Sequence, residues 1–73
     1  MFGISQETKE RLEKEYPIGC RVALDHMDDA KAPPIGSEGT VQHIDDIGTI
    51  HVAWDCGSSL GVLYGEDRCH RID

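Results

Sequence analysis

The chain has 73 residues, with 14 acidic against 7 basic side chains and a formal net charge of -7. A chain this short folds as one domain around one core, and a net stability of only about 3 to 5 kcal/mol argues against a deep catalytic cavity. Its acidic surface repels phosphate backbones, so direct binding to DNA or RNA is not expected. No apolar run reaches the roughly 18 residues of a membrane span, and no secretory signal is apparent, so we expect a cytoplasmic protein without membrane contact.

Residues 6–15 are predicted to form a short helix. They contain neither Gly nor Pro, and Ser5 before them is a suitable N-cap. Pro17 ends the helix, because the residue before a proline avoids helical dihedral angles. We therefore divide the chain into an N-terminal helical extension, residues 1–16, and a β domain, residues 17–73.

The helix carries a thin apolar stripe made of Ile4, Leu12 and Tyr16. Such a stripe either packs on the β domain or forms the contact surface for a partner. The pattern leaves both alternatives open.

Apolar and polar residues alternate in the remaining segments, as is typical of half-buried strands. The expected strands cover residues 20–25, 38–45, 49–54, 60–63 and 68–72. The clearest alternation places Ile50, Val52 and Trp54 in the core. Five short strands without an internal repeat predict a mainly β fold, a five-stranded SH3-like barrel preceded by the short helix.

The connections contain the residues that turns require. Residues 27–36 form a long loop by their Pro and Gly content, and residues 45–48 form a turn. Gly57 is expected to adopt a positive φ angle in a tight hairpin leading to the fourth strand. A bulge is predicted near Gln42 and His43, because the apolar residues on either side of it differ in parity. Gly39 would permit the associated bend.

Several motifs along the chain resemble one known family. They are Met27-Asp28-Asp29, Pro33-Pro34, Gly39-Thr40-Val41, Asp45-Asp46-Ile47-Gly48 and Trp54-Asp55-x-Gly57-Ser58-Ser59-Leu60. From about Tyr16 to Ile72 the chain resembles the bacterial and phage domain-of-unknown-function family 4314, with Cys56 as one departure from its turn chemistry. The resemblance implies a small protein of bacterial, phage or mobile-element origin and assigns no activity. A weaker likeness to Mib/Herc2-type SH3-like domains, which bind short peptides, is an analogy.

Four histidines and three cysteines could suggest zinc or thiol chemistry, but their spacing does not match it. No pair of cysteines or histidines has zinc-ligand spacing, so neither a metal nor another cofactor is expected. Cys69 and His70 are adjacent on a strand and therefore point to opposite faces, which prevents a catalytic dyad. We predict that the chain is not an enzyme.

Three acidic pairs fall in predicted loops or turns. They are Asp28 and Asp29, Asp45 and Asp46, and Glu66 and Asp67. Such pairs bond the local backbone and keep a small protein soluble, present a negative face to a basic partner, or coordinate a cation such as Ca²⁺. These six residues are the candidate partner-binding residues.

Aromatic residues could line a groove beside the acidic loops. Tyr16 and Tyr64 complete the set of candidate partner-binding residues, with Met27 as a further neighbour. The resulting prediction is a non-catalytic protein-interaction module that binds a protein or peptide, a basic one being the simplest match to the acidic loops. The alternative is an acidic inhibitor, or nucleic-acid mimic, that blocks a basic site on a host or defence enzyme.

Overall fold

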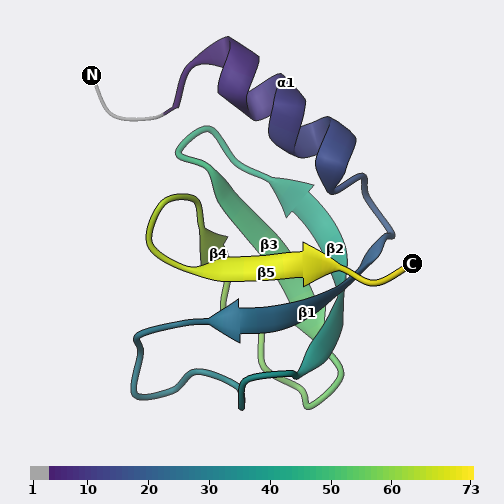
Figure 1. Cartoon of the computed structure of the whole chain (residues 1–73), viewed down its shortest axis with the longest axis vertical. Helices are drawn as coiled ribbons and strands as arrows, with labels where there is room; N and C mark the ends of the chain where they lie inside the picture. The colour runs from purple at the N-terminus through teal and green to yellow at the C-terminus, as the bar shows by residue number, and fades with distance from the viewer. Residues whose placement is uncertain (1–3) are drawn as a thin grey trace.

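The structure is a computed structural model and describes residues 4–73. This part of the chain forms one antiparallel sheet and one helix. The elements are α1 (Gln6–Glu15), β1 (Arg21–His26), β2 (Glu38–Ile44), β3 (Thr49–Trp54), β4 (Val62–Leu63) and β5 (Arg68–Arg71). The five strands follow the order β4-β3-β2-β1-β5 in the sheet (Figure 1). The mainly β fold with one short helix is thus confirmed.

The sheet is strongly curved, but it is not closed. β5 pairs with β1, and β4 pairs with β3 through residues Thr49 and Ile50 only. Within residues 4–73, β4 and β5 form the two edges of the sheet and share no strand pairing. Closure into a barrel, as predicted, is therefore not confirmed, because β4 has two residues and offers almost no edge to β5.

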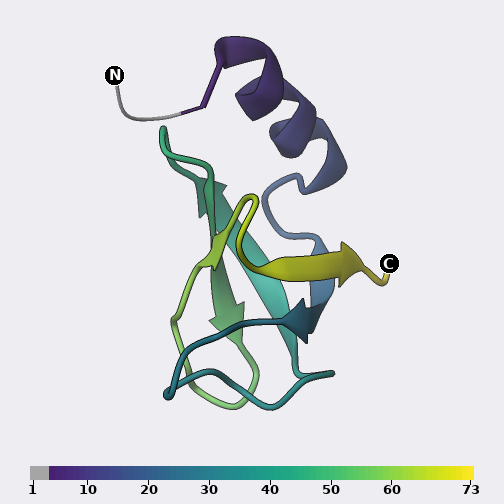
Figure 2. The same ribbon diagram turned by 60° about the vertical axis from the view of Figure 1, so that its left-hand side comes forward.

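The helix begins where its capping residue predicts. The Ser5 side chain accepts a hydrogen bond of 3.1 Å from the backbone N–H of Thr8, which satisfies one of the free donors of the first turn. Leu12 is buried in the core of the sheet, and Ile4 and Tyr16 pack against that core. The apolar stripe therefore packs on the chain's own sheet, and Figures 1 and 2 both place α1 above the same end of it. In the described part of the chain, no helix is long and apolar enough to cross a membrane.

The core side chains lie on the inner face of the curved sheet. Ile50, Val52 and Trp54 are all buried, as their alternation predicts. Trp54 also satisfies its indole N–H, which donates a hydrogen bond of 2.8 Å to the carbonyl oxygen of Leu60. β4 begins at Val62, so the expected strand over residues 60–63 starts too early. The predicted tight turn after β3 does form, because the N–H of Gly57 donates a hydrogen bond of 2.9 Å to the carbonyl oxygen of Trp54, and the N–H of Trp54 donates one of 3.1 Å to the carbonyl oxygen of Ser58.

The bulge in β2 is confirmed, and the structure shows a packing role for Gly39 that the sequence pattern does not predict. The register of β2 against β3 shifts between Val41 and His43. Gly39 packs directly on β3: a Cβ atom there would lie 2.6 Å from Cγ1 of Val52 and 2.8 Å from the carbonyl oxygen of Ala53. The absence of a side chain is required for close packing of the two strands.

The predicted turns have the glycine conformations that they need. Gly48, at the end of the β2–β3 turn, has a φ of 90°, and Gly57, after β3, has a φ of 95°. Both lie in the left-handed region that favours glycine. The Gly48 carbonyl oxygen accepts a hydrogen bond of 3.1 Å from the N–H of Tyr64. The β2–β3 turn and the β4–β5 turn therefore lie side by side.

Candidate functional site

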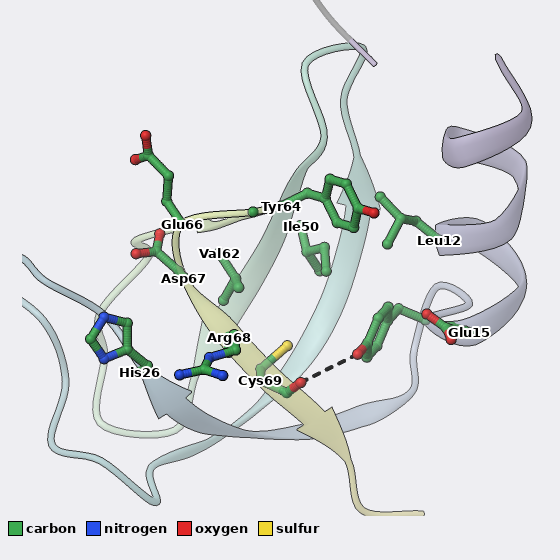
Figure 3. A pocket seen from close by; sticks show the side chains of 12 residues that line it. Leu12, Glu15, His26, Ile50, Val62, Tyr64, Glu66, Asp67, Arg68 and Cys69 are labelled. Atoms are coloured by element: carbon green, nitrogen blue, oxygen red, sulfur yellow. Dashed lines mark hydrogen bonds between the residues drawn. The ribbon is translucent and has the colours of Figure 1, made fainter. Parts of the chain in front are cut away.

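A groove of about 520 Å³ opens between α1, the β4–β5 turn and β5 (Figure 3). Its floor is formed by Leu12 from the helix, Ile50 from β3 and Val62 from β4, all of them buried side chains. The groove lies on the side of the sheet where β4 and β5 are not paired, and the helix and the turn border the end of the core there.

Cys69 contributes to the same floor from β5 and packs against the core. Burial raises the pKa of its thiol to about 12, and the nearby Asp25 carboxylate adds to the shift. The thiol is therefore protonated at neutral pH, whereas nucleophilic attack and metal binding need the thiolate. His70, the next residue, is exposed, and its Nδ1 lies 2.8 Å from a carboxylate oxygen of Asp25. The two side chains point to opposite faces, as predicted.

Two tyrosines, both predicted as partner-binding residues, line the groove. The hydroxyl group of Tyr16 donates a hydrogen bond of 3.3 Å to the carbonyl oxygen of Cys69 (dashed in Figure 3), and burial raises the pKa of this phenol. The hydroxyl group of Tyr64 accepts one of 2.8 Å from Arg11, whose guanidinium carbon lies 5.9 Å from the centre of the ring. The O–H donor of Tyr16 is thus engaged within the chain, whereas Tyr64 uses only an acceptor position and offers a ligand its ring and its O–H. Met27 packs against the core and does not line the groove.

Charged side chains surround the apolar floor. Glu15 stands on the helix side, and Glu66 and Asp67 stand on the opposite side, on the β4–β5 turn (Figure 3). Arg68 and His26 line the groove beside them. Asp67 also accepts a hydrogen bond of 3.0 Å from the N–H of Leu63 and so helps to form the turn. The third predicted acidic pair, residues 66–67, is therefore at the site.

Asp45, from the second acidic pair, lies outside the groove and stabilises the β2–β3 turn. Its carboxylate accepts hydrogen bonds from the N–H groups of Ile47 (3.1 Å) and Thr49 (2.9 Å), and it lies 2.9 Å from Nε2 of His51. Partial burial would raise the pKa of Asp45, but the bonds from His51 and the backbone outweigh it and leave the pKa below the ordinary 3.8. This residue has a structural role.

The other members of the first two acidic pairs also lie outside the groove. Asp46 forms an ion pair of 2.6 Å with Lys9 and so connects the β2–β3 turn to α1. Asp29 accepts a hydrogen bond of 2.7 Å from the N–H of Lys31 within the β1–β2 loop, and its neighbour Asp28 is exposed there. The structure thus places one acidic pair at the groove and two away from it.

The remaining histidines and cysteines do not converge. The rings of His43 and His51 stack with their centres 4.1 Å apart, and Cys20 is buried while Cys56 is exposed. Over residues 4–73, no group of three or more His, Cys, Asp or Glu side chains is arranged to hold a metal ion.

Sequence reasoning missed Glu15 and Arg68 as groove residues. Glu15 carried one signal, because a carboxylate in the last turn of a helix opposes the helix dipole. Arg68 carried no comparable signal in the sequence.

The fold and the groove define a small, mainly β protein with one helix packed on an open antiparallel sheet. Residues 5–72 match the model of a family described as Domain of unknown function (DUF4314), which covers the helix and all five strands. The chain belongs to this family, and the family resemblance noted from its motifs is confirmed. No curated protein and no solved structure matches the chain.

Proposed function

We propose that the chain is a non-catalytic protein-interaction module that takes a segment of a partner protein into the groove between α1 and the β4–β5 turn. The observation that carries this proposal is the groove itself, whose floor is the buried residues Leu12, Ile50 and Val62 and whose apolar surface comes from the rings of Tyr16 and the exposed Tyr64 beside it. Tyrosines combine a large apolar surface with a polar tip and are enriched at protein interfaces. The groove volume lies within the roughly 300–1,000 Å³ typical of ligand sites.

The chemistry of the groove supports binding more than catalysis. Its one thiol, Cys69, has a pKa raised to about 12 by burial, and its two phenols are engaged by Cys69 and Arg11. Catalytic nucleophiles and bases instead need a pKa close to the working pH.

The strand order also supports an SH3-like architecture for this module, in which β4 and β5 are not paired. β1 to β4 follow one another as neighbours in the sheet, and the last strand returns to pair with β1. SH3-like domains often bind peptides, which is an argument from fold analogy. Three free cysteines support a reducing, cytoplasmic compartment as part of the same proposal.

The alternative of an acidic inhibitor that mimics nucleic acid has less support. Such a mimic needs free carboxylates aligned on one face. Asp29, Asp45 and Asp46 instead accept bonds within the chain. We therefore do not propose it.

The test is a selection of random peptides of about a dozen residues on the immobilised full chain, followed by NMR mapping of the peptides that bind. We expect shifts of the amide signals of Leu12, Val62 and Cys69. Tyr64→Ala should weaken binding about tenfold, the loss common for an aromatic interface residue. Ile47→Ala is the matched control, because Ile47 is also exposed on a neighbouring turn but does not line the groove.

Selected peptides that bind equally well to Tyr64→Ala, or that shift only signals remote from the groove, would contradict the proposal. So would a selection that enriches no peptide at all.

A further inference from the structure

We infer that the segment bound in the groove is basic: a Lys or Arg next to an aliphatic residue, with the aliphatic side chain on the floor and the cation against Glu15, Glu66 and Asp67. This inference rests on the proposed function and specifies the chemistry of its partner. It concerns the charge of the bound segment, which the apolar floor of the groove does not determine.

The carboxylates stand on both sides of the floor. Glu15 extends from the end of α1, and Glu66 and Asp67 extend from the β4–β5 turn, with Ile50 and Val62 between the two groups (Figure 3). A ligand seated on the floor therefore has negative charge on each flank. The nearby guanidinium of Arg68 opposes these three carboxylates but does not balance them.

Of the carboxylates outside the groove, six are paired with a basic side chain of the chain itself: Asp25, Glu38, Asp45, Asp46, Asp55 and Asp73. Five others, Glu7, Glu10, Glu13, Asp28 and Asp29, are in no ion pair within the described part of the chain, but none of them lines the groove. Among residues 4–73, Glu15, Glu66 and Asp67 take part in no ion pair. The groove is thus a place where unpaired carboxylates border the rings of the half-buried Tyr16 and the exposed Tyr64. A cationic ligand relieves the repulsion among these carboxylates.

The tyrosines cannot provide the contact to a cation. The O–H of Tyr16 donates to the carbonyl oxygen of Cys69, and the hydroxyl oxygen of Tyr64 already accepts a hydrogen bond from the cationic Arg11. Recognition of positive charge at the rim therefore depends on the carboxylates, while the rings supply apolar contact to the stem of a Lys or Arg.

The experiment measures the affinity of the groove-binding peptides from the selection by calorimetry, at low and at high salt. We expect enriched peptides to carry Lys or Arg beside an aliphatic residue. The double variant Glu15→Gln/Glu66→Gln should bind them about tenfold more weakly, at about threefold for each carboxylate. High salt should weaken binding to the parent chain more than to this variant.

The matched control is Glu7→Gln/Glu10→Gln, which removes the same charge from exposed helix positions outside the groove. It should leave the affinity unchanged, and thermal melting confirms that each variant is folded. Peptides that map to the groove and lose affinity in Tyr64→Ala, yet are neutral or acidic, would overturn the basic partner and leave the proposed function standing. A selection that yields no groove-binding peptide overturns the proposed function itself and this inference with it.

Discussion

The hydroxyl group of Tyr16 donates a hydrogen bond to the carbonyl oxygen of Cys69, and this bond joins the end of α1 to β5, the edge strand at the far side of the sheet. A second connection runs from Arg11 of the helix to Tyr64 of the β4–β5 turn. The helix is thus tied to both structures that face it across the groove. The N-terminal extension is part of the site, because without it the groove has only one wall.

The first prediction concerns the bond between Tyr16 and Cys69. Tyr16→Phe keeps the ring and removes the donor, so the free energy of unfolding should fall by about 0.5 kcal/mol, the low end for a hydrogen bond, because 3.3 Å is long for an O–H···O contact. Urea denaturation followed by circular dichroism measures the change. Tyr64→Phe is the control, since its bond to Arg11 is exposed to solvent and should contribute less. Equal effects of the two variants would contradict the role given to Tyr16.

The second prediction concerns Leu12, the buried residue of α1. Leu12→Ala should cost about 2 to 5 kcal/mol, because it leaves a cavity in the core. That loss is comparable to the whole net stability of about 3 to 5 kcal/mol expected for a chain of this size. A fragment of residues 17–73 loses the same contact and should not unfold cooperatively. Lys14→Ala, at an exposed position of the helix, is the control.

A cooperative melting transition of the 17–73 fragment at the temperature of the full chain would show that α1 contributes nothing to the core. In that case the division of the chain after residue 16 would mark a true domain boundary.

Most of the helix and strand positions follow from short stretches of sequence, because the interactions that form them join residues close together in the chain. The alternation from Ile50 to Trp54 and the glycines at 48 and 57 are readable within a few residues of sequence. The missing pairing between β4 and β5 could not be predicted from the sequence. It depends on the short β4, which begins only at Val62, after a segment in which the carbonyl of Leu60 accepts a hydrogen bond from the indole of Trp54. A tertiary bond of this kind has no sequence signature.

The groove was only partly predictable for a similar reason. Glu66 and Asp67 are candidates from their place in a predicted turn, and Tyr16 and Tyr64 are candidates as aromatic residues that could line a groove. Glu15 lies far from this turn in sequence, and only the packing of Leu12 on the core brings it to the same groove. The acidic pair of residues 45–46 looked equivalent to that of 66–67 but is used for turn formation and an ion pair with the helix.

A third prediction tests the close packing of β2 on β3. Gly39→Ala places a Cβ atom 2.6 Å from Cγ1 of Val52 and 2.8 Å from the carbonyl oxygen of Ala53, so the strands must separate. Overpacking of this kind costs about 1 to 3 kcal/mol, measured by thermal or urea denaturation. Gln42→Ala, at the exposed bulge in the same strand, should change stability by less than about 0.5 kcal/mol. A Gly39→Ala variant as stable as the parent would contradict this packing.

The fourth prediction concerns the order in which the three cysteines react. Cys56 is exposed, whereas Cys20 is buried and Cys69 is half-buried. Burial raises the pKa of both Cys20 and Cys69, the latter to about 12, so little thiolate forms at either position near neutral pH. Alkylation with iodoacetamide, followed by mass spectrometry of peptides, should modify Cys56 first and the other two only as the chain opens. Rapid labelling of Cys69 in the folded chain would contradict its place in the floor.

The last prediction concerns stability in acid. The hydrogen bonds from the Arg21 guanidinium hold the pKa of Asp55 below its ordinary 3.8. The pKa of Asp45 is also below 3.8, because its bonds to His51 and the backbone outweigh the opposite effect of burial. A carboxyl group with a lower pKa in the folded chain than in the unfolded chain stabilises the fold above the unfolded value. This contribution is lost as the pH falls through the folded value, so the melting temperature should decline below about pH 4. Asp55→Asn removes one of these groups and should make the decline shallower. Melting curves recorded from neutral to strongly acidic pH measure both slopes, and identical slopes would show that the pairing of Asp55 with Arg21 contributes no pH-dependent stability.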